Sequence, residues 1–380
     1  MMTGYHRVSR KYPCRICGKP DWCSTTKDQN ISFCARSARN ADRLSVTGWG
    51  IYYSNLTRPF PGGFIVSAKQ NSNTLSVPIA TIELRNKVYR KLNQLSPMPE
   101  PGDVSLGGER AAGEKSHEPC RYGMLPKTTI DRHRLIRLLV KSLSKDDEIT
   151  PSFIGIPGFW VGSNGTARLG CEFDYESDLA LIPFLDPNGL IVACQLKKLR
   201  NTPNPTSKYV WLSSVRWPYG CGPGTPLHHE GAMGFKGKTI GTVLVTEGAL
   251  KAATAQKFLS DRYVIGNSGV ATSHKEIVKA ARKKDLEIAF DADSFTNPHV
   301  ARALATLISL RIREQQFLSY QNPVRIVTWD KRFKGIDDAL ISDATLKHLE
   351  VHEWLRGLTP ECFEAASHQL SGLSLSKISG

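Results

Sequence analysis

The feature that most constrains the fold is a regular alternation of short apolar runs and helical patterns between residues 239 and 329. The apolar runs are rich in β-branched residues, which favour strands, and each is followed by apolar side chains at helical spacing. Strands that alternate with helices in this way indicate a parallel sheet with helices on both faces. Predicted strands cover residues 242–246, 263–265, 286–290 and 324–329, and predicted helices cover residues 249–258, 274–282 and 300–313.

The segments outside this alternation follow different patterns. Proline, glycine and charged residues dominate residues 97–120, which have almost nothing apolar to pack, so we expect this stretch to be disordered. The chain after residue 340 is predicted to be helical. The other predicted elements are helices at 77–95 and 129–143, strands at 179–184 and 190–195, and a turn at 186–189.

Acidic residues follow the predicted strands of the alternating region. Glu247 comes directly after the first strand, Asp291 and Asp293 follow the third, and Asp337 and Asp338 follow the fourth. In an extended chain a spacing of two puts Asp291 and Asp293 on one side, and ligands of such sheets bind at the carboxyl ends of the strands. Carboxylates that converge on one edge form an oxygen-rich site suited to Mg²⁺ or Mn²⁺.

The order of these residues along the chain is more specific than any of them alone. Glu-Gly, a glycine after the second strand, Asp-x-Asp, and then Lys-Gly-x-Asp-Asp resembles the Toprim domain shared by primases, topoisomerases, and some nucleases and recombination proteins. The resemblance implies that Glu247, Asp291 and Asp293 coordinate a divalent metal. Asp337 matches a further acid of primases, and whether Asp337 or Asp338 is the ligand remains open.

Lys251 lies four residues after Glu247 on the helix predicted to follow it, so both side chains can face the same site. Lys251 then contacts either a phosphate or a metal-bound acid, or it forms an ordinary Glu–Lys pair on the helix. The Toprim resemblance covers residues 240–340.

Four of the nine cysteines, Cys14, Cys17, Cys23 and Cys34, lie in one short segment near the N-terminus. Without a secretion signal, such a cluster indicates metal ligands rather than disulfides, and four thiolates complete a structural zinc site. Aromatic and basic residues between the ligands suit stacking on bases and neutralising phosphates of a single strand. Trp22 either takes part in that binding or forms the small core of a metal-dependent domain.

The net charge of the chain is +15, and it is concentrated in two segments. Residues 1–60 hold ten basic and three acidic residues, and residues 187–236 hold six basic residues and one acidic residue. This concentration favours a nucleic-acid partner over general solubility, because basic residues release counterions from phosphates. The second segment contains Lys197, Lys198, Arg200 and Lys208, and its first two lysines point to opposite faces if they lie in one strand.

The order of zinc ribbon, helices, basic strands and Toprim domain is similar to that of bacterial and phage primases. Residues 13–23, 181–195 and 334–340 look like primases of plasmids, phages and integrated mobile elements, although the zinc ligands here are all cysteines and many chromosomal primases use one histidine. In primases, basic residues in the position of this second segment hold the template and the incoming triphosphate. The implied fold is α/β, with five parts: a zinc ribbon (1–58), a helix and linker (59–128), a basic subdomain (129–238), a Toprim domain (239–345) and a helical tail (346–380).

The resemblance implies a DNA primase that makes short RNA primers on a single-stranded DNA template from ribonucleoside triphosphates. Two Mg²⁺ or Mn²⁺ ions held by Glu247, Asp291, Asp293 and Asp337 would support nucleotidyl transfer, one zinc would be structural, and a separate replicative helicase would be a partner. The alternatives are a Toprim nuclease and a non-catalytic recombination mediator that binds DNA. No stretch is long and apolar enough for a membrane span, so we expect a cytoplasmic protein without a membrane partner.

Overall fold

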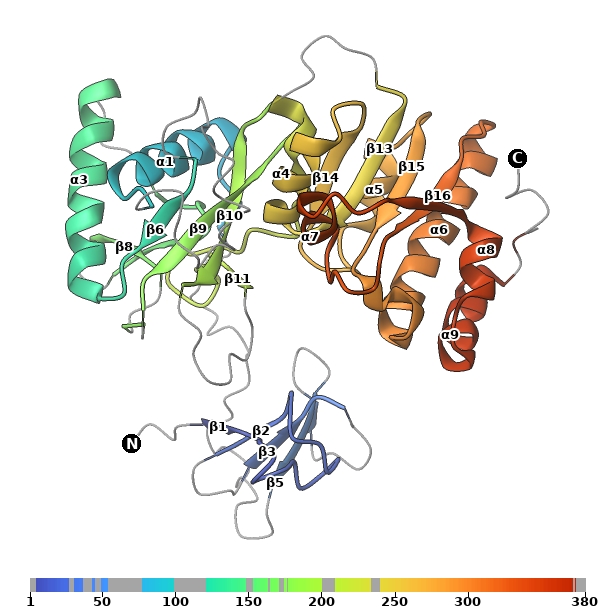
Figure 1. Cartoon of the computed structure of the whole chain (residues 1–380). Coiled ribbons are helices and arrows are strands. Elements are labelled where there is room, and N and C mark those ends of the chain that lie inside the picture. Colours follow the sequence, from blue (N-terminus) through green and yellow to red (C-terminus); the bar gives the residue numbers. More distant parts are fainter. Residues whose placement is uncertain are drawn as a thin grey trace. The chain divides into compact units, whose positions relative to one another are not determined.

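The structure is a computed structural model, and its two compact units, Met1–Leu75 and Ser76–Gly380, are each described by themselves (Figure 1). The residues that it describes are 5–26, 31–36, 43–44, 49–53, 77–98, 121–147, 153–162, 165–170, 174–175, 177–199, 209–233, 240–371 and 373. Nearly all of the predicted linker at 97–120 lies outside these residues, so the expectation of disorder there stays a prediction.

The first unit is built on a five-stranded sheet with neighbouring strands antiparallel, in the order β1-β2-β3-β5-β4. Its small core consists of Cys14, Cys23, Cys34 and Tyr52, so three of the four clustered cysteines are themselves core residues. Among the described residues of this unit, few apolar side chains other than the cysteines are buried. The strands are β1 (Tyr5–Arg7), β2 (Ser24–Thr26), β3 (Ile31–Cys34), β4 (Arg43–Leu44) and β5 (Gly50–Tyr53).

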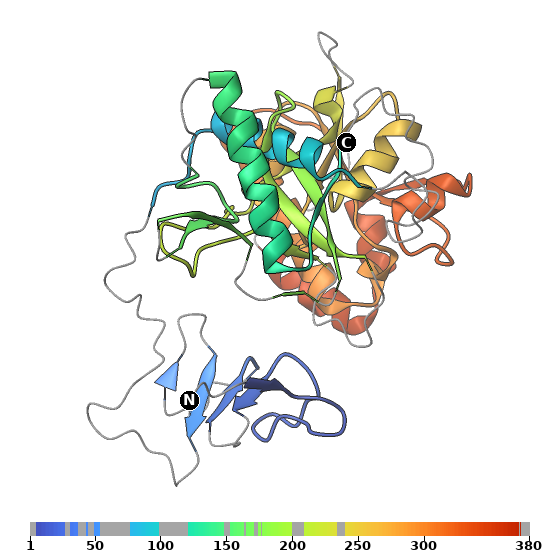
Figure 2. The same ribbon diagram turned by 90° about the vertical axis from the view of Figure 1, so that its left-hand side faces the viewer.

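The second unit begins with an antiparallel sheet of order β11-β10-β9-β6, and Figure 2 shows α3 lying across it. One face of this sheet packs against two helices through Leu125, Leu181 and Leu196. A two-stranded hairpin of β7 and β8 adjoins it. The elements are α1 (Ile82–Leu95), β6 (Gly123–Leu125), α3 (Thr129–Asp147), β7 (Phe159–Val161), β8 (Ala167–Leu169), β9 (Leu179–Leu185), β10 (Ile191–Lys198) and β11 (Tyr209–Trp211).

Local chemistry sets the ends of these elements. Helix α1 begins at Ile82 rather than at residue 77, because the Thr81 side chain accepts a hydrogen bond from the Leu84 amide (3.4 Å) and caps the helix there. The turn between β9 and β10 forms as expected, since an Asp186 carboxylate oxygen accepts hydrogen bonds from the Asn188 and Leu190 amides, both at 2.8 Å.

The alternating region forms a six-stranded sheet of order β12-β14-β13-β15-β16-β17. The four central strands are parallel, and the strand at each edge runs antiparallel to its neighbour. The expectation of a mixed α/β fold is confirmed. The strands are β12 (His228–His229), β13 (Thr242–Glu247), β14 (Tyr263–Asn267), β15 (Asp285–Ala289), β16 (Val324–Thr328) and β17 (Lys347–Glu350).

Helices cover both faces of this sheet, as Figure 1 shows. Along β13, Val243 and Val245 face one core while Leu244 faces the other, because successive side chains of a strand alternate. The first core includes α5, α6, α8 and α9, and the second includes α4 and α7. The helices are α4 (Ala249–Phe258), α5 (His274–Ala280), α6 (Pro298–Leu318), α7 (Ile336–Ile341), α8 (Val351–Arg356) and α9 (Pro360–Leu370).

The prediction that the chain after residue 340 is purely helical is wrong, because β17 pairs with β16 before α8 and α9 begin. Three of the four residues of β17 are polar or charged, so it shows no apolar alternation. It is held by pairing and by charge, and Glu350 accepts a hydrogen bond from the Arg325 guanidinium at 3.0 Å. None of the helices in the described part of the chain combines the length and apolar character that a membrane span requires.

Candidate active site and zinc centre

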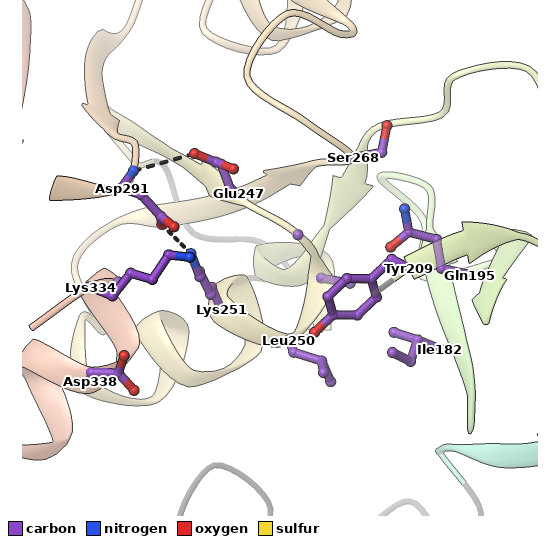
Figure 3. A pocket seen from close by; sticks show the side chains of 13 residues that line it. Ile182, Gln195, Tyr209, Glu247, Leu250, Lys251, Ser268, Asp291, Lys334 and Asp338 are labelled. Atoms are coloured by element: carbon purple, nitrogen blue, oxygen red, sulfur yellow. Dashed lines mark hydrogen bonds and ion pairs between the residues drawn. The ribbon is translucent and has the colours of Figure 1, made fainter. Parts of the chain in front are cut away.

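A pocket of about 230 Å³ opens where β13 and β15 end, between the parallel sheet and the antiparallel sheet (Figure 3). Two carboxylates from these strand ends, a third from α7 and two lysines line one part of it, and residues of β9, β10 and β11 line another. The residues lining the pocket are Ile182, Gln195, Tyr209, Glu247, Gly248, Ala249, Leu250, Lys251, Ser268, Asp291, Lys334, Gly335 and Asp338.

Glu247 is the last residue of β13, and the chain turns at Gly248 into α4. Gly248 has a positive φ of 83°, and a Cβ on Gly266 would lie only 2.7 Å from the Gly248 carbonyl oxygen, so both positions suit glycine. The Glu247 carboxylate accepts a weak hydrogen bond from the Asp291 amide (3.4 Å). Burial and the nearby Asp291 charge raise the pKa of Glu247, while Lys251 opposes this shift.

Asp291 follows β15, and its carboxylate forms an ion pair with the ammonium group of Lys251. Figure 3 shows the Lys251 side chain reaching from α4 to this carboxylate. Lys251 therefore does not form the local pair with Glu247 that the helical spacing allowed. It neutralises an acid contributed by a strand forty residues further along the chain.

Asp293 does not share the side of an extended chain with Asp291, so that part of the sequence interpretation is wrong. The chain turns immediately after Asp291 into a short 3₁₀ helix, η3 (Ala292–Phe295), and Asp293 lies within it. Its side chain is exposed and accepts a hydrogen bond from the Asn297 side-chain amide at 3.3 Å. Asp293 is not among the residues that line the pocket, and its role as a metal ligand stays a prediction.

Asp337 and Asp338 occupy the first turn of α7 and differ in position. Asp338 lines the pocket, whereas Asp337 has no exposed surface and lies beneath it. A Cβ on Gly335 would collide with the Asp337 carboxylate and lie 2.9 Å from Lys251 Cε, so this turn packs closely against Lys251. The choice of metal ligand between the two aspartates stays open.

The carboxylate oxygens of the pocket do not lie close enough together to form a compact ligand cluster. Within the residues that the structure describes, the one group of three or more potential ligand atoms that lie within 4.8 Å of one another is the cysteine cluster. Glu247, Asp291 and Asp338 nevertheless place three hard oxygen donors around one pocket, and burial, followed by the charge of Asp291, raises the pKa of Glu247. This donor set fits a divalent cation of the Mg²⁺ type.

The facing wall of the pocket comes from the antiparallel sheet. Gln195 on β10 is paired with Ile182 on β9, and Lys197 with Tyr209 on β11, so these side chains share one face. Lys198 belongs to the opposite face. The prediction that the two adjacent lysines diverge is confirmed, with Lys197 on the pocket side, although it is buried and does not line the pocket. Arg200 and Lys208 lie outside the described residues.

Two tryptophans near this wall have structural roles. Trp211 packs edge-on against Phe184 with ring centroids 4.7 Å apart, and Trp217 stacks on Trp160 at 4.7 Å. They are therefore occupied by other rings.

A buried polar network joins the four-stranded and the six-stranded sheets of the second unit. Glu230, in the 3₁₀ helix η2 (Glu230–Met233), forms an ion pair with Arg121 and accepts a hydrogen bond from His228 Nε2 at 2.8 Å. His228 Nδ1 accepts a hydrogen bond from the Leu185 amide (3.1 Å), which fixes a neutral ring. Burial lowers the pKa of His228. Burial alone would raise the pKa of Glu230, but the contacts of Glu230 with Arg121 and His228 outweigh this effect and lower its pKa to about 2. No spacing in the sequence signals this network.

The four cysteines of the first unit converge as predicted. Their ligand atoms all lie within 4.8 Å of one another, with Cys23 Sγ 3.7 Å from Cys17 Sγ and 3.8 Å from Cys34 Sγ. Four sulfurs at the usual Zn–S distance around one tetrahedral zinc are about 3.8 Å apart, so the thiols fit one zinc ion. Burial raises the pKa of Cys23 to about 12; at Cys17, hydrogen bonds from the Lys19 amide and the other thiols outweigh burial and lower the pKa to about 7.

Trp22 is 66% exposed and is not part of the core, so its interpretation as a core residue is wrong. The second interpretation, a contact with nucleic acid, stays a prediction. A pocket of about 490 Å³ in this unit is lined by basic, aromatic and hydroxyl side chains, among them Lys11, Tyr12 and Arg15.

Ser268 and Lys334 line the carboxylate pocket although the sequence interpretation gave them no role. Lys334 could have been found, because it begins the Lys-Gly-x-Asp-Asp motif. Ser268 had no such signal, since its place depends on the length of β14.

Comparison with known proteins found likenesses of structure only. No protein-family model and no curated protein sequence matches the chain. Solved primase structures are similar over most of it. The zinc-binding and RNA polymerase domains of the Aquifex aeolicus primase are 14% identical over 77% of this chain and 73% of theirs, with a TM-score of 0.43. The E. coli primase catalytic core is 15% identical over 77% of this chain and 90% of its own, with a TM-score of 0.43. The RNA polymerase domain of Mycobacterium tuberculosis DnaG is 14% identical over 77% of this chain and 99% of its own, also with a TM-score of 0.43.

Proposed function

We propose that this chain is a DNA primase that joins ribonucleoside triphosphates into short RNA primers on a single-stranded DNA template. The observation that carries the proposal is the single pocket in which Glu247, Asp291 and Asp338 meet Lys251 and Lys334 at the carboxyl ends of a parallel sheet. The Glu-Gly, Asp-x-Asp and Lys-Gly-x-Asp-Asp motifs that contribute these residues support assignment of the parallel sheet as a Toprim domain.

The acidic side of the pocket would hold the catalytic cations. The first candidate ligands of these cations are Glu247, Asp291 and Asp338, and Asp293 and Asp337 are further candidates. Mg²⁺ or Mn²⁺ bound there, two ions in the proposed reaction, would supply Lewis-acid stabilisation of the charge that develops on the α-phosphate and the leaving pyrophosphate.

The lysines of the pocket have a separate task. In the structure, Lys251 balances the Asp291 carboxylate. With a cation held by these carboxylates, the Lys251 ammonium would be available to bind a phosphate oxygen, and Lys334 adds a second positive charge to the same wall. The two lysines would bind and orient the triphosphate and thus favour transfer at its α-phosphorus.

The first unit would supply template binding. One zinc ion on the four cysteines would hold its small core, and the basic and aromatic side chains around Tyr12, together with exposed Trp22, would contact single-stranded DNA. Among the basic residues of this segment, Lys197, Arg200 and Lys208 stay candidates for holding template or nucleotide, whereas Lys198 lies on the face of β10 opposite the pocket. A separate replicative helicase and a mobile-element origin are further parts of this proposal.

The test is to incubate the full chain with end-labelled single-stranded DNA, Mg²⁺ and the four ribonucleoside triphosphates, one of them labelled on its α-phosphate. A primase produces short labelled RNA and leaves the DNA intact. Degradation of the labelled DNA would instead assign a Toprim nuclease, and binding without either reaction would assign a recombination mediator.

A further inference from the structure

Gln195 is a largely buried polar residue whose side-chain amide faces a pocket instead of a protein partner. It lies in β10, is only 6% exposed, and lines the pocket that contains the carboxylates. Among the described residues no hydrogen bond joins its side-chain amide to another group, and the amide faces the pocket, where water or a ligand can reach it. An amide in this position obtains its hydrogen bonds from water or from a ligand that displaces the water.

The surroundings of Gln195 differ from the carboxylate side of the pocket. Ile182 is its direct partner across β9 and β10, and Tyr209 is its diagonal neighbour on β11. Leu250 of α4 completes an apolar and aromatic surface, and Figure 3 shows these side chains apart from the Asp291–Lys251 pair. The pocket is thus charged at one end and apolar at the other, with one hydrogen-bonding amide at the apolar end.

A nucleotide has the same division. Its phosphates suit the lysines and a cation at the acidic end, and its sugar and base suit the surface formed by Ile182, Tyr209 and Leu250. The volume of 230 Å³ is below the roughly 300 Å³ at which pockets for whole small molecules begin, so this cavity has room for only part of a nucleotide.

We propose that the Gln195 amide binds the ribose 2′-hydroxyl of the nucleotide and makes the site selective for ribonucleotides over deoxyribonucleotides. The inference rests on the proposed function in one respect, namely that the ligand is a nucleotide. A templated enzyme must accept all four bases, so a fixed protein amide is better suited to the sugar, which all four substrates share. The 3′-hydroxyl must be released as the nucleophile of the next addition, whereas the 2′-hydroxyl has no such task.

The physical basis of this selectivity is the burial of Gln195. The amide offers both a donor and an acceptor, and so does a hydroxyl. A 2′-deoxynucleotide would leave the buried amide unpaired, and sites built to bind a substrate hydroxyl discriminate strongly against analogues that lack it. We expect the wild-type chain to bind ATP about ten- to a hundredfold more tightly than 2′-deoxyATP.

The test measures binding and not polymerisation. Calorimetric titrations of the full chain with Mn²⁺ and no template compare ATP, 2′-deoxyATP and 3′-deoxyATP for the wild type and for Gln195→Met, which keeps the side-chain length. We expect the variant to bind ATP and 2′-deoxyATP within about twofold of each other, because only the ATP complex loses a hydrogen bond. Gln316→Leu removes an exposed amide from α6 and should keep the wild-type preference. Thermal unfolding checks that each variant is folded, and Gln195→Leu replaces Gln195→Met if that variant is not.

Three results would overturn the inference. The wild type could bind ATP and 2′-deoxyATP equally, the folded Gln195 variant could keep the wild-type preference for ATP over 2′-deoxyATP, or the variant could lose only the preference for ATP over 3′-deoxyATP. Failure of ATP to bind at all would overturn it as well. The outcome is separable from the proposed function. Primer synthesis without sugar preference would refute only the role of Gln195, and sugar preference without primer synthesis would refute only the primase.

Discussion

The chain contains two candidate metal sites that are built in opposite ways. In the first unit, Cys14, Cys23 and Cys34 are core residues, and their sulfur atoms are already at the spacing of a zinc tetrahedron. In the second unit, the carboxylates stand at the edge of a sheet whose two cores contain many aliphatic side chains. Lys251 already balances one of them.

Under the proposed function, the difference indicates what a metal bound at each site would do. Where the ligands are the core, the metal is part of the folding energy, as in small zinc domains generally. Where a large apolar framework positions the ligands, the metal can enter and leave without unfolding the protein, so it is available for chemistry. Removal of metal should therefore affect the stability of the first unit and the activity of the second.

The largest expected effect is at the cysteine cluster. Structural zinc contributes about 10–16 kcal/mol of apparent binding free energy in small zinc domains, which exceeds what the core of the first unit can replace. Cys34→Ser should abolish the bound zinc and expose the remaining cysteines to thiol reagents. Zinc content by mass spectrometry and thiol titration measure both effects.

The matched control for that experiment is Cys194→Ala, which removes a buried thiol from the second unit. It should retain one zinc per chain. A wild-type chain without zinc, or a Cys34→Ser chain that keeps it, would contradict the comparison.

The next effect in size is at Asp291. Asp291→Asn keeps the shape of the side chain and removes its charge, and nucleotide incorporation should fall by about 10²–10³-fold, the usual cost of losing a group that stabilises transition-state charge. The thermal unfolding midpoint should change by less than about 4 °C, because the framework is intact. Asp285→Asn makes the same change at the other end of β15 and should keep its activity. Equal activity of the two variants would remove Asp291 from the site.

A smaller effect concerns the stability of the second unit, to which we expect Arg121, Glu230 and His228 to contribute without a metal. The pKa of Glu230 falls to about 2 in the fold, so its ionisation stabilises the fold above about pH 4.5, and this contribution is lost as the pH falls toward 2. His228 is neutral in the fold and is protonated when unfolded, so acid destabilises this region already below about pH 6.5.

Arg121→Met should therefore lower the free energy of unfolding at pH 7 by about 3 kcal/mol, and the gap to wild type should narrow as the pH falls toward 2. Urea unfolding of both proteins at several pH values measures this difference in the free energy of unfolding, and a chelator is present to show that metal is not involved. Arg332→Met removes an arginine from the exposed pair with Asp330 and should change stability little. A gap independent of pH would mean that the ion pair does not stabilise the fold through Glu230.

The smallest effect is at Lys251. Lys251→Met leaves Asp291 without its cation, so the site should bind Mg²⁺ more tightly while incorporation falls by about tenfold, because a triphosphate contact is lost. Lys251 also lowers the pKa of Glu247, so the acidic limb of the pH–rate profile should move to higher pH. Magnesium titrations and pH profiles measure both effects. Lys257→Met, on the last turn of the same helix, is the control, and weaker magnesium binding by the Lys251 variant would show that this lysine does not compete with the cation.

The parts of the fold that repeat a simple pattern could be predicted. The limits of α4 match the predicted helix because Gly248 separates it sharply from β13. The carboxyl ends of parallel strands must meet at one edge, and Glu247 and Asp291 accordingly line one pocket. Short or polar elements escaped prediction, because β17 is held by pairing with β16, and η3 turns Asp293 away from Asp291.

Long-range partners could not be predicted either. Arg121 and Glu230 are 109 positions apart, and nothing in the local sequence links them. The neighbourhood of Gln195 depends on the register of three strands, in which a shift by one residue would place it on the other face. Such features follow from tertiary pairing and not from spacing along the chain.

Primase activity is measured most directly as templated synthesis without a primer. The full chain, Mg²⁺ and all four ribonucleoside triphosphates are incubated with poly(dT) or poly(dC), and the composition of the product is determined. A primase should make short oligoadenylate on poly(dT) and short oligoguanylate on poly(dC), and the Asp291→Asn variant should make neither. Product whose composition ignores the template, or full synthesis by the Asp291 variant, would contradict the proposed function.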